Sequence, residues 1–295
     1  MNFDFDYQGK RASISLPITA QLRTQFANSP KSFSYTGALP SNWKQDYFKM
    51  FLKHDADKMP LATLRDEIAA HCGASSGDVW VAAVIDFVQS GLEYDHATAF
   101  NIAGSKIRYP SETLLDGMGV CMDKTILLAA LLQDAGYGLG IFNFDRANHM
   151  SLGLLVPDGY GNFGTSYAMV ESTAPTPIGQ IPARYAGGIR LDTRPELVII
   201  GNGHLRFNAI VAQKAAEKEA EKQYGKDYLA MPAAKQAIYR DMQELKLEMD
   251  QAKVALKGCK GRLDPQTYAR CQGLNASYNQ LVERYNALVA QFNQK

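Results

Sequence analysis

The sequence has no excess of charge of either sign. Its 31 Lys and Arg residues nearly balance its 30 Asp and Glu residues, which leaves a net charge of +1 at pH 7. A protein that holds nucleic acid needs a positive field, because contacts to phosphate groups dominate the affinity. The composition therefore argues against nucleic acid as a partner.

Long apolar runs are also missing. No stretch approaches the roughly 20 apolar residues that cross a bilayer, and Met1 to Asp6 contain neither the basic nor the apolar part of an export signal. We therefore expect a soluble chain without a membrane span. Hydrophobic residues make up 46% of the sequence, which is enough for a substantial core and excludes disorder as the main state.

Cysteine and histidine are few and scattered. The four cysteines include no CxxC pair, and the five histidines include no HxH or HxxxH pair. Structural zinc sites draw their ligands from such pairs. No acidic cluster resembles a calcium-binding loop either. The sequence therefore predicts no metal site and no cofactor.

The hydrophobic period changes along the chain. Residues 1–44 are expected to form short strands or an irregular cap, and helical spacing follows, with Asp78 as the predicted N-cap of one buried helix. Short β-rich runs then extend to about residue 200. From there on Ala, Glu, Lys, Gln and Leu dominate without a strand signal. We predict an α+β domain over residues 1–203 and a helical appendage over residues 204–295.

The β-rich runs are expected to form an antiparallel sheet. They cover Tyr137–Phe144, His149–Val156, Ser166–Ser172 and Glu196–Ile200, and a segment dense in turn formers separates the second run from the third. A hairpin centred on Tyr160 would place His149 beside Glu171. A carboxylate in that position would orient an imidazole, although each residue could also be structural, Glu171 as an exposed charge at a strand end.

Cys121 has the position of a nucleophile. It follows a glycine loop and opens an apolar helix that is expected to end at Gly136. The unpaired N–H groups and the dipole at a helix start stabilise a thiolate. A cysteine at a helix start is by itself more often a packing residue, so the nucleophile interpretation depends on His149 and Glu171.

Five sequence blocks together resemble the transglutaminase-like cysteine-enzyme superfamily, in particular its prokaryotic branch. The order and the spacing of the blocks agree with that family over about residues 45–190. The blocks are Phe87–Tyr94, Arg108–Leu115, Gly119–Tyr137, His149–Gly153 and Glu171–Pro175. The C-terminal helices lie outside the resemblance.

The resemblance implies a papain-like core with a catalytic triad. Cys121 would be the nucleophile, His149 the base, and Glu171 would take the place that Asp usually holds. Two positions that flank the nucleophile, Val120 and Met122, are apolar here where the family pattern is acidic. This departure favours altered specificity or a degenerate enzyme.

An oxyanion in such a reaction needs a donor besides the Cys121 backbone N–H. Gln89, near the end of the preceding helix, is the candidate, because an amide can donate without carrying charge. The alternative is that Gln89 is an ordinary exposed glutamine.

The C-terminal region contains two heptad patterns. Apolar residues step by 4 and 3 from Ile238 to Leu256 and again from Leu274 to Phe292, which predicts an antiparallel helical hairpin. Its role is open among docking to the catalytic domain, self-association and binding of a protein partner. Continuing both seams reaches Cys259 and Cys271, so we predict a disulfide bond between them.

This disulfide would place the protein outside the cytoplasm, in the periplasm or secreted, because such bonds persist in oxidising compartments. The alternative is a pair of reduced cysteines, Cys259 and Cys271, in a cytoplasmic protein.

The combined patterns predict a cysteine-dependent acyl-transfer enzyme. It would act on amide or peptide bonds of proteins or peptides, as a peptidase, an amidase or a transglutaminase. The alternative is a catalytically degenerate scaffold, or a protein-binding module that works through the helical hairpin.

Overall fold

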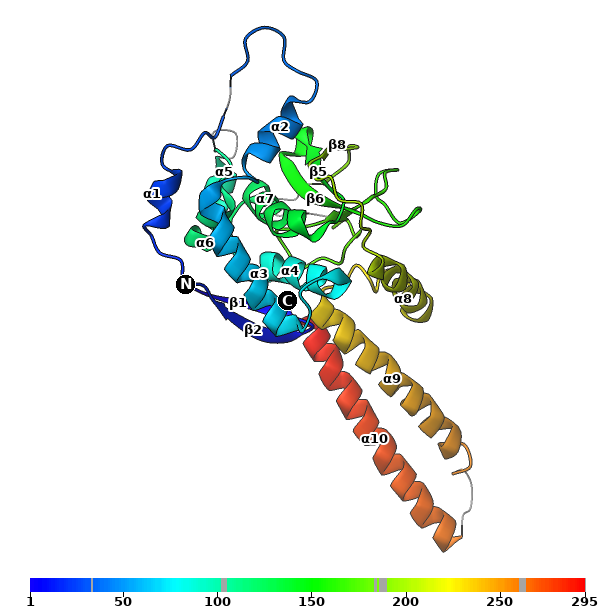
Figure 1. Cartoon of the computed structure of the whole chain (residues 1–295). Helices are drawn as coiled ribbons and strands as arrows, with labels where there is room; N and C mark the ends of the chain where they lie inside the picture. The colour runs from blue at the N-terminus through cyan, green and yellow to red at the C-terminus, as the bar shows by residue number, and fades with distance from the viewer. Residues whose placement is uncertain (33, 102–104, 183–184, 186–189, 260–263, 295) are drawn as a thin grey trace. The chain divides into compact units, whose positions relative to one another are not determined.

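The structure is a computed structural model of the 295-residue chain and describes residues 1–32, 34–101, 105–182, 185, 190–259 and 264–294. The fold mixes helices and sheets, as predicted (Figure 1). The chain divides into two compact units, Met1–Gln213 and Lys214–Lys295. The division lies inside helix α8 (Ala209–Tyr224).

The first unit begins with two paired strands, β1 (Asn2–Tyr7) and β2 (Lys10–Ser15). Alternate side chains of β1 are buried, and the rings of Phe3 and Phe5 meet the ring of Phe87 edge to face at 5.7 and 5.5 Å. The period of two thus gives the strand one apolar face, and this face covers the helix that carries Phe87.

In the described residues, six α-helices lie between β2 and Cys121. They are α1 (Leu22–Phe26), α2 (Trp43–Met50), α3 (Lys58–Cys72), α4 (Gly77–Ser90), α5 (His96–Phe100) and α6 (Pro110–Asp116). Helix α4 is largely buried, as its apolar spacing predicts. The predicted N-cap of α4 was wrong, because Ser76 holds that position and the Asp78 carboxylate accepts from Tyr137 and the Ala209 N–H.

Among the described residues no single helix has the length and apolar composition of a membrane span. The segment Asp55–Cys72 and helix α4 meet this criterion only as a pair, across a bend of 113°.

The central sheet has the strand order β7-β6-β5-β8, and all its neighbouring strands are antiparallel. Its strands are β5 (Leu139–Phe144), β6 (His149–Leu155), β7 (Tyr167–Val170) and β8 (Glu196–Ile199). The four strands were predicted within a few residues. Strands β5 and β6 are buried along nearly their whole length. Ile141 and Leu152 belong to the main core, whereas Phe142 and Phe144 pack with Phe163 and Leu191 in a second apolar cluster.

Helix α7 (Cys121–Leu132) packs against β6. All its side chains except that of Met122 are buried. A short 3₁₀ turn, η3 (Gln133–Ala135), follows, and Gly136 stops the helical path with a left-handed conformation at φ 79°. The helix that begins at Cys121 is therefore fixed at the centre of the unit, and its start faces the beginning of β6.

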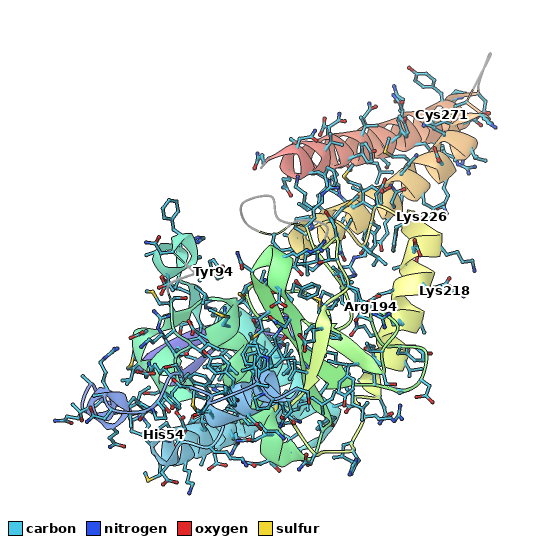
Figure 2. All side chains as sticks on the ribbon, turned by 90° about the horizontal axis from the view of Figure 1, so that it is seen from above. His54, Tyr94, Arg194, Lys218, Lys226 and Cys271 are labelled. Carbon is cyan, nitrogen blue, oxygen red and sulfur yellow. A yellow bond between two sulfur atoms is a disulfide. The ribbon has the colours of Figure 1, made fainter. Side chains whose placement is uncertain are left out.

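The second unit is built from the end of α8 and two long helices, α9 (Ala233–Leu256) and α10 (Pro265–Asn293), which contact each other. Met242 and Leu245 of the predicted seam are buried. The predicted disulfide joins Cys259 to Cys271, with their Cα atoms 5.7 Å apart (Figure 2). Four residues of the intervening turn, 260–263, lie outside the described residues.

Candidate active site

Three elements of the first unit bring Cys121, His149 and Glu171 together. Cys121 is the first residue of α7, His149 is the first residue of β6, and Glu171 follows the last residue of β7. Asn148 turns the chain into β6 with a left-handed conformation at φ 46°, which Asn tolerates better than most residues. The packing of α7 on β6 then places the thiol beside the imidazole.

The predicted pairing of His149 with Glu171 had the wrong register. The sheet pairs Leu152 with Val170, two residues away from the predicted alignment. A shift of two keeps every side chain on its face, whereas a shift of one would reverse it. Glu171 therefore still reaches His149, and its Oε2 lies 2.9 Å from the His149 Nε2. Nδ1 is left as the ring nitrogen available to Cys121.

The imidazole of His149 is buried and charged. Burial alone would lower the pKa of His149, but its interactions with Cys121 and Glu171 outweigh burial and raise the pKa to about 9. The ring is therefore protonated at neutral pH.

Glu171 is fully buried and held by backbone and hydroxyl donors. Its Oε1 accepts from the Ser172 N–H at 3.0 Å, from the Thr173 N–H at 2.9 Å and from the Thr173 hydroxyl at 2.6 Å. Burial raises the pKa of Glu171, but the contacts with His149 and Thr173 reverse this effect and hold the pKa below its ordinary value. The carboxylate remains ionised and fixed in direction.

Gln89 does not point its amide at Cys121. The side-chain Nε2 donates to the Glu171 carbonyl at 2.8 Å and to the Thr176 carbonyl at 3.0 Å, and the residue is buried, not exposed. Both amide hydrogens are used, so no N–H of Gln89 is left for an oxyanion. The contacts instead fix the chain that carries Glu171.

Asp123 fixes the start of the helix that carries Cys121. Its carboxylate accepts from the Val120 N–H at 3.1 Å, and from the Arg108 N–H and guanidinium at 2.8 and 2.7 Å. The Arg108 guanidinium also pairs at 2.6 Å with the carboxylate of Asp95, the residue that follows Tyr94 in the sequence. These contacts join the loop before Cys121 to the strand β3 (Glu93–Tyr94), which pairs in parallel with β4 (Met118–Gly119).

Gly119 is closely surrounded at the end of β4. A Cβ atom at this position would lie 2.9 Å from the Asp123 Cβ and 3.1 Å from the Thr113 Cγ2. Any side chain here would displace Asp123 from its contacts, so the glycine is needed for a close approach and not for an unusual φ.

Lys124 and Thr125 are buried polar residues whose roles the sequence did not reveal. The Lys124 Nζ donates to the carbonyls of Leu92 at 3.0 Å and Gln89 at 3.4 Å, and burial lowers the pKa of Lys124 to about 8. The signal available in the sequence was a lysine among apolar residues of a buried helix. Its contacts join the end of α4 to α7.

A cavity of about 340 Å³ opens at Cys121. Tyr94, His96 and Tyr185 contribute aromatic walls, and the Tyr185 ring lies 4.5 Å from the His149 ring, centre to centre. Burial, with the charges of Cys121 and Glu171, raises the pKa of Tyr94 to about 12, so its phenol is neutral. Cys121 is itself only 2% exposed, and a substrate must reach it through this cavity.

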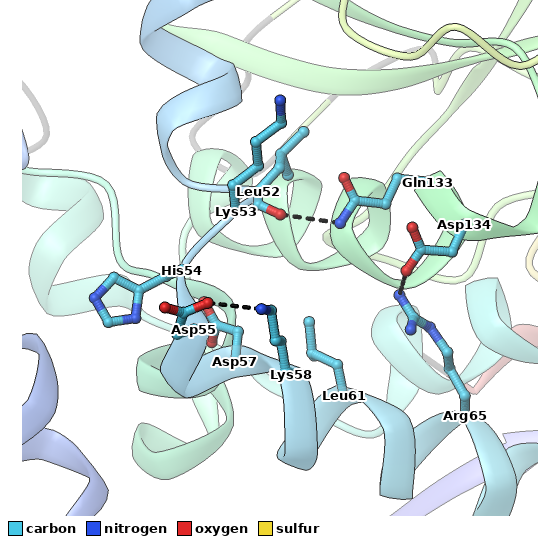
Figure 3. A pocket seen from close by; sticks show the side chains of 10 residues that line it. All are labelled: Leu52, Lys53, His54, Asp55, Asp57, Lys58, Leu61, Arg65, Gln133 and Asp134. Carbon is cyan, nitrogen blue, oxygen red and sulfur yellow. Dashed lines mark hydrogen bonds and ion pairs between the residues drawn. The ribbon is translucent and has the colours of Figure 1, made fainter.

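A larger cavity of about 570 Å³ lies away from these residues, beside α3 (Figure 3). It shares no lining residue with the cavity at Cys121, and two ion pairs lie along it: Lys58 binds Asp55 at 2.7 Å, and Arg65 binds Asp134 at 3.1 Å. Size alone therefore does not identify the site. No group of three or more His, Cys, Asp or Glu side chains that could hold a metal ion occurs in the described part of the chain.

Residues 67–154 match a family model described as a transglutaminase-like domain. The matched segment contains Cys121 and His149 and ends before Glu171. The resemblance to the transglutaminase-like superfamily is thereby confirmed for this segment, and families of this type generally include cysteine enzymes. A search of curated proteins found no match to the chain.

Proposed function

We propose that the chain is a cysteine-dependent acyl-transfer enzyme with a papain-like core, which acts on amide or peptide bonds of proteins or peptides. The observation that carries this proposal is the placement of His149 between the Cys121 thiol and the buried Glu171 carboxylate. These two neighbours raise the pKa of His149 to about 9. A protonated imidazole beside a thiol at a helix start favours a thiolate–imidazolium pair at neutral pH.

In the acylation step the Cys121 sulfur attacks the carbonyl carbon of the scissile amide. The carbonyl oxygen becomes an oxyanion, and the first-turn N–H groups of α7, which have no acceptor inside the helix, face the developing charge. The tetrahedral intermediate collapses as His149 gives its proton to the leaving amine. The C–N bond breaks, and a thioester on Cys121 remains.

In the deacylation step His149 removes a proton from the incoming nucleophile. The nucleophile attacks the thioester carbon, the C–S bond breaks, and the Cys121 thiolate leaves beside the protonated His149. Water as the nucleophile releases a carboxylic acid, and an amine forms a new amide, so the same site supports hydrolysis and transamidation. Glu171 stays ionised throughout and keeps the imidazole in position. Digestion of a peptide library with and without an amine donor, read by mass spectrometry, distinguishes the two outcomes.

The reactivity of Cys121 tests the proposal directly. We expect iodoacetamide at neutral pH to alkylate Cys121 faster than Cys72, the half-buried free cysteine of the same unit, which serves as an internal control. His149→Ala should slow the alkylation of Cys121 and leave that of Cys72 unchanged. If Cys121 reacts no faster than a small free thiol, the chain is a scaffold and not an enzyme.

A further inference from the structure

We propose that a second cavity beside His149 is a subsite for an uncharged, apolar side chain of the substrate, and that Met122 sets this preference. This inference rests on the proposed acyl-transfer function. The cavity measures about 200 Å³ and shares Asn148 and His149 with the cavity at Cys121. A polypeptide bound across Cys121 therefore reaches both cavities at once.

Three of the seven residues that line this subsite are apolar, Met122, Phe144 and Met150, and the other four are polar. Met122 is the second residue of α7 and the one residue of that helix whose side chain is not buried. Phe144 and Met150, which are 1% and 4% exposed, complete the apolar lining from the ends of β5 and β6. Thioethers and an aromatic ring adapt to aliphatic side chains of different shape.

The charged groups of the subsite already have partners. Besides His149, its one charged lining residue is Asp145, whose carboxylate accepts from Lys44 at 3.0 Å and from Asn143 at 2.7 Å. The charge of His149 is directed to Glu171 and Cys121. The Asp145 side chain is 69% exposed, so a charged substrate side chain would have to compete with Lys44 or Glu171 for these groups, whereas an apolar one would not.

The volume of the subsite supports the same assignment. About 200 Å³ is several times the ~30 Å³ that one water occupies, so the empty cavity is hydrated. An aliphatic side chain that displaces this water gains hydrophobic free energy, and one well-placed methylene in such a pocket changes specificity by about 10-fold or more.

Alkylation of Cys121 by two substituted iodoacetamides tests the subsite in the full-length chain. One reagent carries a neutral N-butyl arm and the other an N-(3-aminopropyl) arm, and Cys72 gives the reference rate for each. We expect the butyl reagent to alkylate Cys121 at least ~10-fold faster than the aminopropyl reagent, because only the neutral arm enters without desolvating a charge. Met122→Glu should reverse the order, and Met122→Leu should preserve it.

The matched control is Ala174→Glu, which adds the same charge to the cavity at Cys121, where Met122 is not a lining residue. If Met122→Glu and Ala174→Glu change the ratio of the two alkylation rates equally, the effect is a general electrostatic one and the subsite proposal is wrong. Equal rates for the two reagents with the unsubstituted chain would overturn it as well. If plain iodoacetamide reacts with Cys121 no faster than with a small thiol, the acyl-transfer function fails, and the subsite fails with it.

Discussion

The charge of His149 depends on two neighbours that act against its burial. Removing water from the ring favours neutral imidazole, and a pKa near 9 in place of 6.5 corresponds to a net stabilisation of the charged form on the order of 3 kcal/mol. The opposing charge of Glu171 is held by four donors, the imidazole included. The site is therefore an electrostatic unit in which neither group can be changed alone without affecting the other.

The first prediction concerns the titration of His149. Because its pKa is raised, its contribution to the free energy of unfolding is complete below about pH 6.5 and is lost as the pH rises through about 9. Glu171 has a lowered pKa, so its contribution to the free energy of unfolding is complete above about pH 4.5 and is lost as the pH falls through the lowered pKa. Imidazole NMR should give a midpoint near 9, and Glu171→Gln should lower it by at least one unit. A midpoint unchanged by this variant would contradict the pairing.

The second prediction concerns Gln89, whose amide binds the carbonyls of Glu171 and Thr176. Gln89→Ala leaves both buried acceptors unsatisfied, so we expect a loss of about 1–3 kcal/mol in the free energy of unfolding together with slower alkylation of Cys121. Urea unfolding and alkylation kinetics measure the two effects. Slower alkylation with an unchanged unfolding midpoint would instead favour the oxyanion role.

At the scale of elements, the candidate active site depends on the contacts that join α7 to the sheet. The Thr125 hydroxyl, one turn after Cys121, donates to the Met150 carbonyl at 3.3 Å and lies 3.3 Å from the Ser172 hydroxyl. These partners follow His149 and Glu171 directly in the sequence. One buried hydroxyl thus joins the three elements that carry the proposed triad.

The third prediction follows from this junction. Thr125→Val keeps the shape of the side chain and removes the hydroxyl, so it should reduce the unfolding free energy by about 1–3 kcal/mol and slow the alkylation of Cys121. Thr125→Ser keeps the hydroxyl and should retain most of the alkylation rate. Equal rates in the Val and Ser variants would show that the hydroxyl does not position the site.

The sequence predicted elements better than contacts. The β-rich runs, the apolar helix from Cys121 and its stop at Gly136 follow from periodicity and turn residues, which act locally. The register of β6 and β7 depends on packing between strands, and the Gln89 contacts depend on where a loop 82 residues later returns. Such long-range placement leaves no periodic signal. The sequence therefore did not reveal that the Gln89 amide binds the Glu171 and Thr176 carbonyls, or that Tyr185 lines the cavity beside His149.

At the scale of the whole molecule, the two units differ in how their stability arises. The first has a large core with a buried sheet, whereas Met242 and Leu245 are the deepest apolar residues in the seam between α9 and α10. A pair of helices buries little area, so the disulfide carries a larger share of the stability there. The bond is also compatible with an extracytoplasmic location, which stays a prediction.

The fourth prediction concerns this bond. Reduction should raise the intact mass by two protons and destabilise the second unit by about 3 kcal/mol through loop-closure entropy. Helix content followed by circular dichroism during urea unfolding, with and without reductant, measures the change. Cys259→Ser should reproduce the destabilisation and leave the alkylation rate of Cys121 unchanged. No mass difference on reduction would remove the bond and the inference about location.

The crowding around Gly119 also limits how this site can diverge among related sequences. A substitution at 119 displaces Asp123 and with it the start of the nucleophile helix, so selection should return glycine from any randomised pool. Position 122 borders a cavity, and its side chain is the one of helix α7 that is not buried, so substitutions there are expected to disturb the packing least. Under the proposed function, single substitutions at 122 would change the preferred substrate side chain while the contacts of Asp123 are kept.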